Sequence, residues 1–273
     1  MRAGQGSQGV STTDAPFVFI RDLALASLLF CIPTAVPGAP CAADRTTERV
    51  QVSHIYDGDT VKLADGRRLR LIGINTPEIN REGQPSQPLA NQAKTLLTTL
   101  INRQNRTLNL QYGRESHDHY GRLLAHAFLD DGMNVAARLL EQGLATTLVV
   151  PPNTWGQSCY QRIESTARAA GRGLWALPDY QLIASMDLHP DTRGFRIVRG
   201  RIIAVRESRY SLWLDLEGPL VVHISRKDLV NFQPGFPEAL VGKTVDVRGW
   251  IKEDKNGLRV NVRHPAALAA NAP

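Results

Sequence analysis

Residues 70–78 read RLIGINTPE, and this stretch decides the fold that we expect for the chain. Leucines flank Arg70 on both sides, so the alternation of a β-strand places the arginine on the face opposite its apolar side. The strand then enters a polar turn in which Pro77 fixes the backbone before Glu78. A carboxylate held in this way suits a group that must meet a water molecule at hydrogen-bond distance.

Turn residues interrupt the alternating segment around this stretch. Asp57-Gly58-Asp59 and Ala64-Asp65-Gly66 separate short runs in which apolar residues occupy every second position. The pattern predicts a meander of antiparallel strands over residues 50–71. A further pair of strands, 107–112 and 123–129, encloses a polar loop.

Helical spacing of apolar residues marks three segments in the first two thirds of the chain. One spans residues 89–100, one begins at Asn134 as a candidate N-cap and ends at Gly143, and one runs from Tyr160 to Gly171. Five strands with flanking helices predict a mainly β, α+β fold in which the strands close a small barrel.

Strand-like runs resume at Phe195 after a stretch of mixed polarity. Five candidate strands follow, at residues 195–205, 210–216, 220–224, 244–251 and 258–262, with the only long insertion, 225–240, between the third and the fourth. That order predicts a second, OB-like barrel over residues 195–265. We therefore expect a first domain at 44–178, a linker at 179–194 and a loose tail at 266–273.

The chain of 273 residues carries a formal net charge of +6, which favours an anionic partner such as nucleic acid through long-range attraction. Hydrophobic residues make up 42% and charged residues 21% of the chain, a balance that supports packed domains and excludes a multi-span membrane protein. Charge alone leaves the chemistry open, so the motifs must decide it.

The first residues have the order of a secretory signal peptide. An arginine precedes an apolar run at residues 23–36, and prolines and small residues follow it up to Ala43. The run is shorter than the roughly 20 residues that a transmembrane helix needs, so we expect export to the periplasm or the medium without a stable membrane anchor. Removal of residues 1–43 also removes Cys41, which predicts that Cys159 is a buried, unpaired small residue.

Phosphodiester hydrolysis needs groups that neutralise transition-state charge and a group that positions water. The Asp57-Gly58-Asp59-Thr60 turn presents carboxylates to a hard cation, but Asp-Gly turns are so common that this turn alone indicates little. Residues 70–78 add an outward arginine and a fixed carboxylate, a far less common combination. His117 and His119 lack a third ligand at zinc spacing, so we leave them out of the metal site.

Five motifs together resemble the staphylococcal nuclease family in order and spacing. They are DGDT at 57–60, RLIGINTPE at 70–78, DHYGR at 118–122, LEQGLA at 140–145 and GLW at 173–175. The resemblance covers about residues 50–176 and none of the second barrel. It implies an OB-type barrel and a calcium-dependent nuclease that acts on DNA and RNA and leaves 3′-phosphate ends.

The resemblance also implies roles for seven residues, carried over by motif position. Arg70 and Arg122 clamp the phosphoryl oxygens, Glu78 acts as general base or positions the water, Asp59, Asn75 and the carbonyl of Thr76 bind the metal, and Tyr120 lies against the nucleotide. A guanidinium fork matches two phosphoryl oxygens at once, which is why arginine suits the clamp.

Two positions depart from the family pattern. Asn75 stands where the family commonly has a second aspartate, so we expect weaker calcium binding or use of another divalent cation. Residues 146–150 hold no tyrosine, whereas the staphylococcal enzyme carries tyrosines near the bound nucleotide there. Base contacts are therefore left open.

Alternatives remain for both halves of the chain. A catalytically silent nucleic-acid-binding protein would keep the first barrel while its metal site decays at Asn75. In the second barrel, aromatic and basic residues form either a stacking platform for nucleic acid or part of the core, or the barrel serves as a protein-interaction or envelope-tethering module. The residues concerned are Tyr210, Trp213, Trp250, Arg199, Arg201 and Arg248.

Overall fold

A computed structural model describes residues 39–80, 85–236, 240–254 and 257–270 of the chain. The apolar run of the expected signal peptide, 23–36, lies outside the described residues. Within the described part, no helix is long and apolar enough to cross a membrane.

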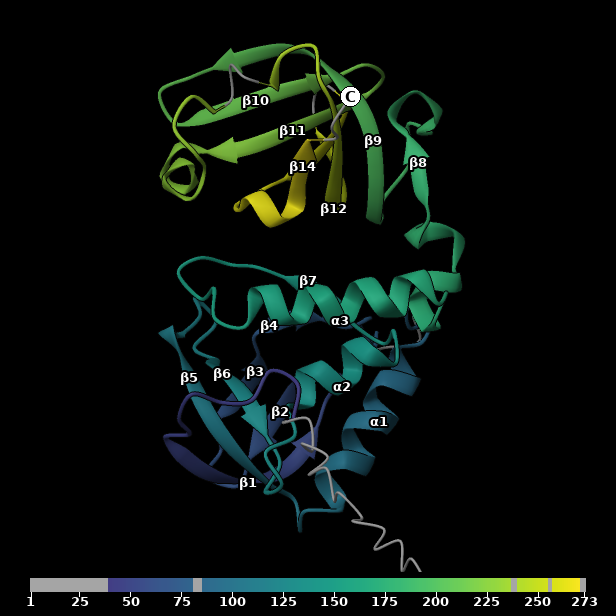
Figure 1. Cartoon of the computed structure of the whole chain (residues 1–273). Coiled ribbons are helices and arrows are strands. Elements are labelled where there is room, and N and C mark those ends of the chain that lie inside the picture. Colours follow the sequence, from purple (N-terminus) through teal and green to yellow (C-terminus); the bar gives the residue numbers. More distant parts are fainter. Residues whose placement is uncertain (1–38, 81–84, 237–239, 255–256, 271–273) are drawn as a thin grey trace, which may run out of the picture. The chain divides into compact units, whose positions relative to one another are not determined.

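Five strands close the first barrel in the order β1-β2-β3-β6-β5 (Figure 1). They are β1 (Glu48–Ile55), β2 (Thr60–Leu63), β3 (Arg68–Leu71), β5 (Thr107–His117) and β6 (Leu123–Phe128). Neighbours pair antiparallel except β3 and β6, which pair parallel. The predicted meander and strand pair are confirmed, and a five-stranded closed barrel of this kind is the OB-type architecture.

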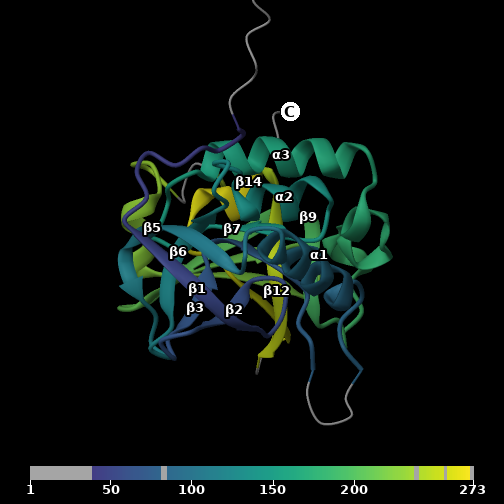
Figure 2. The same ribbon diagram turned by 90° about the horizontal axis from the view of Figure 1, so that it is seen from below.

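Three helices pack beside this barrel, as the apolar spacing predicts. They are α1 (Ala90–Asn102), α2 (Val135–Glu141) and α3 (Gln157–Ala169). Figure 2 shows α1 and α2 next to the barrel strands, and their buried leucines and alanines join the strand residues in one apolar core. Asn134 caps α2 as expected, because its side chain accepts a hydrogen bond from the backbone N–H of Ala137.

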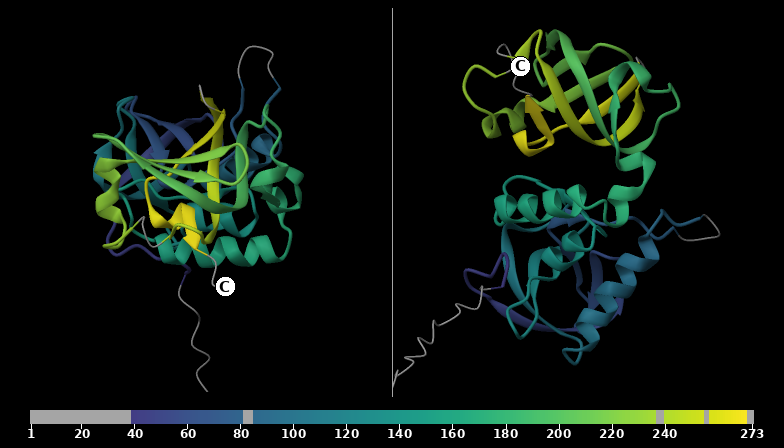
Figure 3. Two further views of the ribbon diagram at one scale, coloured as in Figure 1. Left: turned by 90° about the horizontal axis from the view of Figure 1, so that it is seen from above. Right: turned by 45° about the vertical axis from the view of Figure 1, so that its right-hand side comes forward.

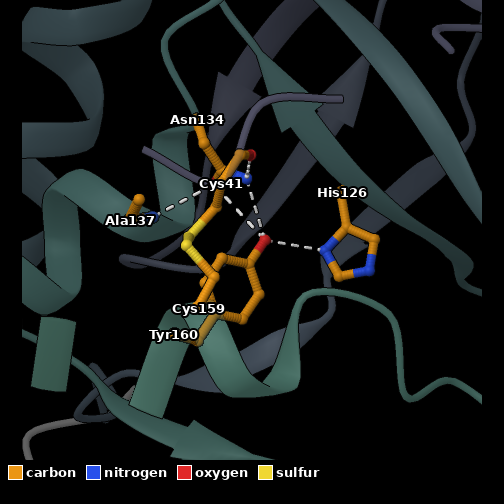
Figure 4. Close-up of a disulfide and its surroundings, with 6 residues drawn as sticks. All are labelled: Cys41, His126, Asn134, Ala137, Cys159 and Tyr160. Carbon is orange, nitrogen blue, oxygen red and sulfur yellow. Dashed lines mark hydrogen bonds between the residues drawn. A yellow bond between two sulfur atoms is a disulfide. The ribbon is translucent and has the colours of Figure 1, made fainter. Parts of the chain in front are cut away.

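A short sheet of β4 (Gly73–Asn75) and β7 (Thr146–Leu148) connects the barrel to α3. Gly73 has a φ of +86°, and a Cβ atom there would lie 2.4 Å from Cε2 of Tyr160. The Tyr160 hydroxyl in turn hydrogen-bonds Nδ1 of His126 at 2.9 Å and accepts from the amide of Asn134 at 3.0 Å (Figure 4). Only glycine fits between this buried network and β4, which leads directly to residues 75–78.

A disulfide joins Cys41 to Cys159 at the start of α3 (Figure 4). The expectation that Cys159 is unpaired is therefore wrong, and this pairing is incompatible with a chain that has lost Cys41 by cleavage after Ala43. Asn134 adds a second link, because its amide donates to the carbonyl oxygen of Cys41 at 2.9 Å. Cys41, which the sequence pattern assigns to the signal peptide, therefore belongs to the folded domain. No local pattern predicts this pairing, because the two cysteines are 118 residues apart.

A seven-stranded sheet follows, and its β9–β12 pairing closes a second barrel of β9, β10, β11, β13 and β12 (Figure 3). Its strands are β8 (Leu182–Ala184), β9 (Gly194–Glu207), β10 (Ser211–Leu216), β11 (Leu220–Ser225), β12 (Thr244–Asp254), β13 (Gly257–Asn261) and β14 (Leu268–Ala270). The parallel pairing of β11 with β13 repeats that of β3 with β6 in the first barrel. Mainly β structure with a few helices and two barrels confirms the predicted fold class.

Two segments outside the barrel strands are more ordered than predicted. Within the expected linker, β8 pairs parallel with β9 and extends the sheet. Within the expected loose tail, β14 pairs with β12, and Leu268 is buried in the second core. Both segments are too short for a periodic pattern to reveal them, and the neighbouring strand supplies their hydrogen-bond partners.

We predict that Cys159→Ser lowers the free energy of unfolding by about 2 to 4 kcal/mol, because the disulfide closes a long loop in the unfolded chain. Denaturant unfolding followed by circular dichroism measures the change. Adding a reductant should destabilise the wild type by a similar amount and leave Cys159→Ser unaffected. Equal stability of the oxidised wild type and the variant contradicts the pairing.

Candidate active site

The turn between β1 and β2 presents two aspartates in a fixed geometry. One carboxylate oxygen of Asp57 accepts hydrogen bonds from the backbone N–H groups of Asp59 at 3.0 Å and Thr60 at 2.7 Å. The turn also lies close against α1, since a Cβ atom on Gly58 would be 2.7 Å from that of Ala93. The Asp-Gly-Asp pattern is therefore a packed, rigid turn.

Asp59 is buried, with 2% of the residue exposed, and its carboxylate collects partners from three segments. Oδ2 accepts from the backbone N–H of Thr76 at 2.8 Å and from its hydroxyl at 2.9 Å. Arg70 NH1 lies 2.5 Å from the same oxygen, and the hydroxyl of Thr60 donates to Oδ1 at 3.1 Å. Burial of a carboxylate is costly unless it is paired and hydrogen-bonded in this way.

Arg70 is held on several sides as well as by its ion pair. Its NH1 donates to the carbonyl of Leu71 at 3.1 Å, and its NH2 donates to the carbonyl of Ile74 at 3.1 Å and to Oδ1 of Asn75 at 2.9 Å. The side chain is 11% exposed. Strand alternation correctly places Arg70 opposite the buried leucines, and these bonds then fix the direction of its guanidinium.

Glu78 stands at the end of the polar turn and is anchored by Gln87. The backbone N–H of Glu78 donates to the side-chain oxygen of Gln87, and the backbone N–H of Gln87 donates to the carbonyl of Glu78, both at 3.0 Å. Partial burial raises the pKa of Glu78, and the Asp59 charge raises it further, against lowering by Arg70 and Arg122. A raised pKa suits a carboxylate that takes a proton from water.

Arg122 follows a turn built by Asp118. One oxygen of Asp118 accepts from the backbone N–H groups of Tyr120 and Arg122, and the other pairs with Nε of Arg122 at 2.7 Å. The guanidinium carbon lies 5.5 Å from the centre of the Tyr120 ring, which is 65% exposed. Asp118 and Tyr120 therefore orient Arg122 from two sides.

A cavity of about 530 Å³ brings Arg70, Glu78 and Arg122 together, with Asn75 and His119 also in its lining. Tyr120 is not among the lining residues, and Asp59 and Thr76 lie buried behind Arg70 and Asn75. Arg70, Arg122 and Glu78 thus face the same space, whose lining also includes Glu115 and Asp118 and which is large enough for a phosphate group and its flanking sugars.

Oxygen donors for a cation gather behind this cavity. Among the described residues, no three histidine, cysteine, aspartate or glutamate side chains form a ready ligand cluster. The donors present are the Asp57 and Asp59 carboxylates, the Asn75 amide and the Thr76 carbonyl, which accepts from the Asn75 amide at 3.2 Å. Burial first, and then the charges of Asp59 and Glu78, raise the pKa of Asp57 to about 6.

Sequence reasoning left Asp57 and Gln87 out of the site. The family motif assigns the metal to Asp59 in this turn, and the closeness of Asp57 to Glu78 depends on the closed barrel. Gln87 pairs with Glu78 across a nine-residue separation that no periodic pattern marks. A glutamine just before an apolar helix is the one local signal that pointed to it.

The residues proposed for a stacking platform in the second barrel do not act as one unit. Its three arginines all form ion pairs: Arg199 with Asp246, Arg201 with Glu217 and Arg248 with Glu164. Tyr210 is 69% exposed and packs under Arg209, while Trp213 packs against His223. Of the six residues, only Trp250 and Arg248 line a cavity that reaches Glu78.

Known proteins share this site-bearing region. Residues 68–177 match the family model described as staphylococcal nuclease homologue. The thermonuclease of Staphylococcus intermedius is 33% identical over 163 residues, which are 58% of this chain and 95% of that protein. The thermonuclease of Staphylococcus hyicus is 30% identical over 129 residues, 46% of this chain and 75% of that protein. Endonuclease YncB of Bacillus subtilis is 30% identical over 135 residues, 48% of this chain and 63% of that protein.

The barrel, the shared cavity of two arginines and a glutamate, and relatives named thermonuclease and endonuclease together define the class: a nuclease that cleaves phosphodiester bonds. The chain belongs to the staphylococcal nuclease family. The family model ends at residue 177, before β8, so the match does not extend to the second barrel.

We predict that Arg70→Ala and Arg122→Ala each lower kcat by about a hundredfold or more, as expected when a preorganised donor to the transition state is lost. Arg70→Ala should also destabilise the fold by about 3 to 5 kcal/mol, because it leaves the buried Asp59 carboxylate without its counter-charge. Plasmid cleavage rates and denaturant unfolding measure the two effects.

Arg68→Ala is the matched control, since Arg68 is an exposed arginine on the same strand and does not line the cavity. Its activity and stability should equal those of the wild type. Full activity in Arg70→Ala would refute the assignment of the site.

Proposed function

We propose that the chain is an exported, metal-dependent nuclease that hydrolyses phosphodiester bonds of DNA, RNA or both by attack of water on phosphorus. The observation that carries this proposal is the single cavity lined by Arg70, Glu78 and Arg122. A phosphate placed there meets the guanidinium groups of Arg70 and Arg122 and the carboxylate of Glu78 at once.

Glu78 acts as general base or positions the attacking water. Because its pKa is raised, Glu78 is a better proton acceptor near neutral pH than an ordinary glutamate. The paired hydrogen bonds with Gln87 hold the backbone of Glu78, and Pro77 restricts the turn before it. The carboxylate therefore reaches the same point in each catalytic cycle without a costly reorganisation.

Arg70 and Arg122 clamp the phosphoryl oxygens from two sides. The guanidinium of Arg70 is directed by Asp59 and Asn75, and that of Arg122 by Asp118. Charge that develops on the phosphoryl oxygens in the transition state is stabilised by these preorganised cations more strongly than by water. Tyr120 packs against Arg122 at the rim, where we propose that it contacts the nucleotide.

The oxygen donors fit a hard divalent cation such as calcium. Asp59 and Asn75 would hold it with the carbonyl of Thr76, and Asp57 adds a neighbouring carboxylate. All four are oxygen donors, and the mutual repulsion of Asp57, Asp59 and Glu78 is a charge pattern that a cation relieves. When bound, a divalent cation supplies positive charge that polarises the phosphate.

Asn75 weakens that cation site in our proposal. Its amide oxygen is already engaged by Arg70 at 2.9 Å, and it lacks the charge that an aspartate would bring. Because the number of charged ligands sets the affinity of calcium sites, we expect this chain to need more calcium or to accept another divalent cation.

Export is supported by the disulfide as well as by the apolar segment near the start of the sequence. Disulfides persist in oxidising compartments such as the periplasm and the medium, and Cys41 and Cys159 are paired here. Any processing of the chain must then occur before Cys41. Protein recovered from its source cells should lie outside the cytoplasm with this pair oxidised, and a cytoplasmic chain with free thiols contradicts the proposal.

We predict that the chain nicks supercoiled DNA with added calcium and that a chelator abolishes the nicking. Asn75→Asp should lower the calcium concentration for half-maximal activity by roughly tenfold, because it adds a charged ligand. A metal series in the plasmid assay measures both effects. Binding of DNA without nicking under every metal tested would favour the catalytically silent alternative, and unchanged metal dependence in Asn75→Asp contradicts the assignment of Asn75.

A further inference from the structure

The cavity that holds Arg70, Glu78 and Arg122 has a second wall. Lys227, in the 3₁₀ helix Arg226–Asn231, and Arg263, after β13, both line it. These two basic residues belong to the second barrel, which the family match does not reach. Both barrels lie in one compact unit, residues 38–273.

A second cavity, of about 460 Å³, continues the first. The two share Asn75, Glu78, Leu148, Val150 and Arg263 in their linings, so together they form one groove that passes Glu78. Beyond the shared residues, the second cavity is lined by Phe195, Trp250, Lys252 and His264 of the second barrel. We call this continuous space the interbarrel groove.

An ion pair holds the second barrel at this groove. Arg248 on β12 makes two bonds to the carboxylate of Glu164 on α3, at 2.6 and 2.7 Å. The same carboxylate accepts from the backbone N–H of Thr147 at 2.7 Å and from its hydroxyl at 2.8 Å. Glu164 is 4% exposed, so a charge-assisted fork on a fully hydrogen-bonded carboxylate fixes β12 against β7, which lines the groove.

Charge and side-chain type along the groove match a nucleic-acid strand. Lys227 and Lys252 form no ion pair within the described part of the chain, and Arg263 has only a long contact of 3.5 Å between Nε and Asp228. Trp250, which is partly buried, gives the second cavity aromatic surface, and the buried Phe195 lies beside it in the lining. Free cations beside aromatic surface are the combination that binds phosphates and bases of single strands.

We propose that the second barrel is a substrate-binding module, in which Lys227, Arg263 and Lys252 bind phosphates that flank the phosphate undergoing cleavage. This inference rests on the proposed nuclease function of the first barrel. The occupant is a nucleic-acid strand that extends from Glu78 along β12. The three residues are binding residues, so their loss should weaken the hold on long substrates and leave the chemical step unchanged.

The test compares the groove variant Lys227→Gln/Arg263→Gln with Lys243→Gln/Arg209→Gln, in full-length chains. The control pair removes the same charge from exposed positions of the second barrel that line neither cavity. Fluorescence anisotropy with a labelled oligothymidylate, in chelator, measures binding without turnover. Cleavage of the same oligonucleotide with calcium gives kcat and KM.

The groove variant should bind at least about fivefold more weakly, and the slope of log affinity against log salt should become shallower by about 1 to 2. KM should rise and kcat should stay as in the wild type, while the control pair matches the wild type in every measurement. Wild-type binding and KM in the groove variant overturn the inference and leave the proposed function standing. A wild-type chain that binds through the groove but never cleaves supports the inference and contradicts the proposed function.

Discussion

The buried carboxylate of Asp59 is the constraint on which the rest of the site depends. It receives two hydrogen bonds from Thr76 and an ion pair from Arg70, so the β1–β2 turn, β3 and the turn after β4 are tied to one charge. A charge so deeply buried would be costly without these partners. These three segments are therefore held together as one unit. Glu78 is positioned with them because it lies two residues after Thr76.

Local sequence patterns predicted the strands and helices whose apolar residues recur at a regular spacing. Alternation placed Arg70 on the face opposite its neighbouring leucines, and the cap at Asn134 marked the start of α2. Strand order with one long insertion predicted the second barrel. Each of these features depends on neighbours in sequence, so propensity and hydrophobic spacing were sufficient. That Arg70, Glu78 and Arg122 share a cavity came instead from the motif resemblance.

Pairings between distant segments could not be predicted in the same way. The Cys41–Cys159 disulfide, the Gln87 anchor of Glu78 and the Arg248–Glu164 ion pair each join residues that no period relates. The strands β8 and β14 could not be predicted from the sequence either, because a segment of three residues forms a strand only when it pairs with the edge of a neighbouring strand. Such contacts need the closed barrels, and among them the Arg248–Glu164 pair fixes β12 against β7.

We propose that Arg70, Glu78 and Arg122 act on one phosphate beside a cation held by Asp59. A crystal structure of the full chain with calcium and a non-hydrolysable phosphorothioate oligonucleotide tests it most directly. We expect one phosphate in contact with both guanidinium groups, Glu78 facing it and calcium on Asp59. Arginines that contact different phosphates, or a calcium ion bound away from Asp59, would contradict this mechanism.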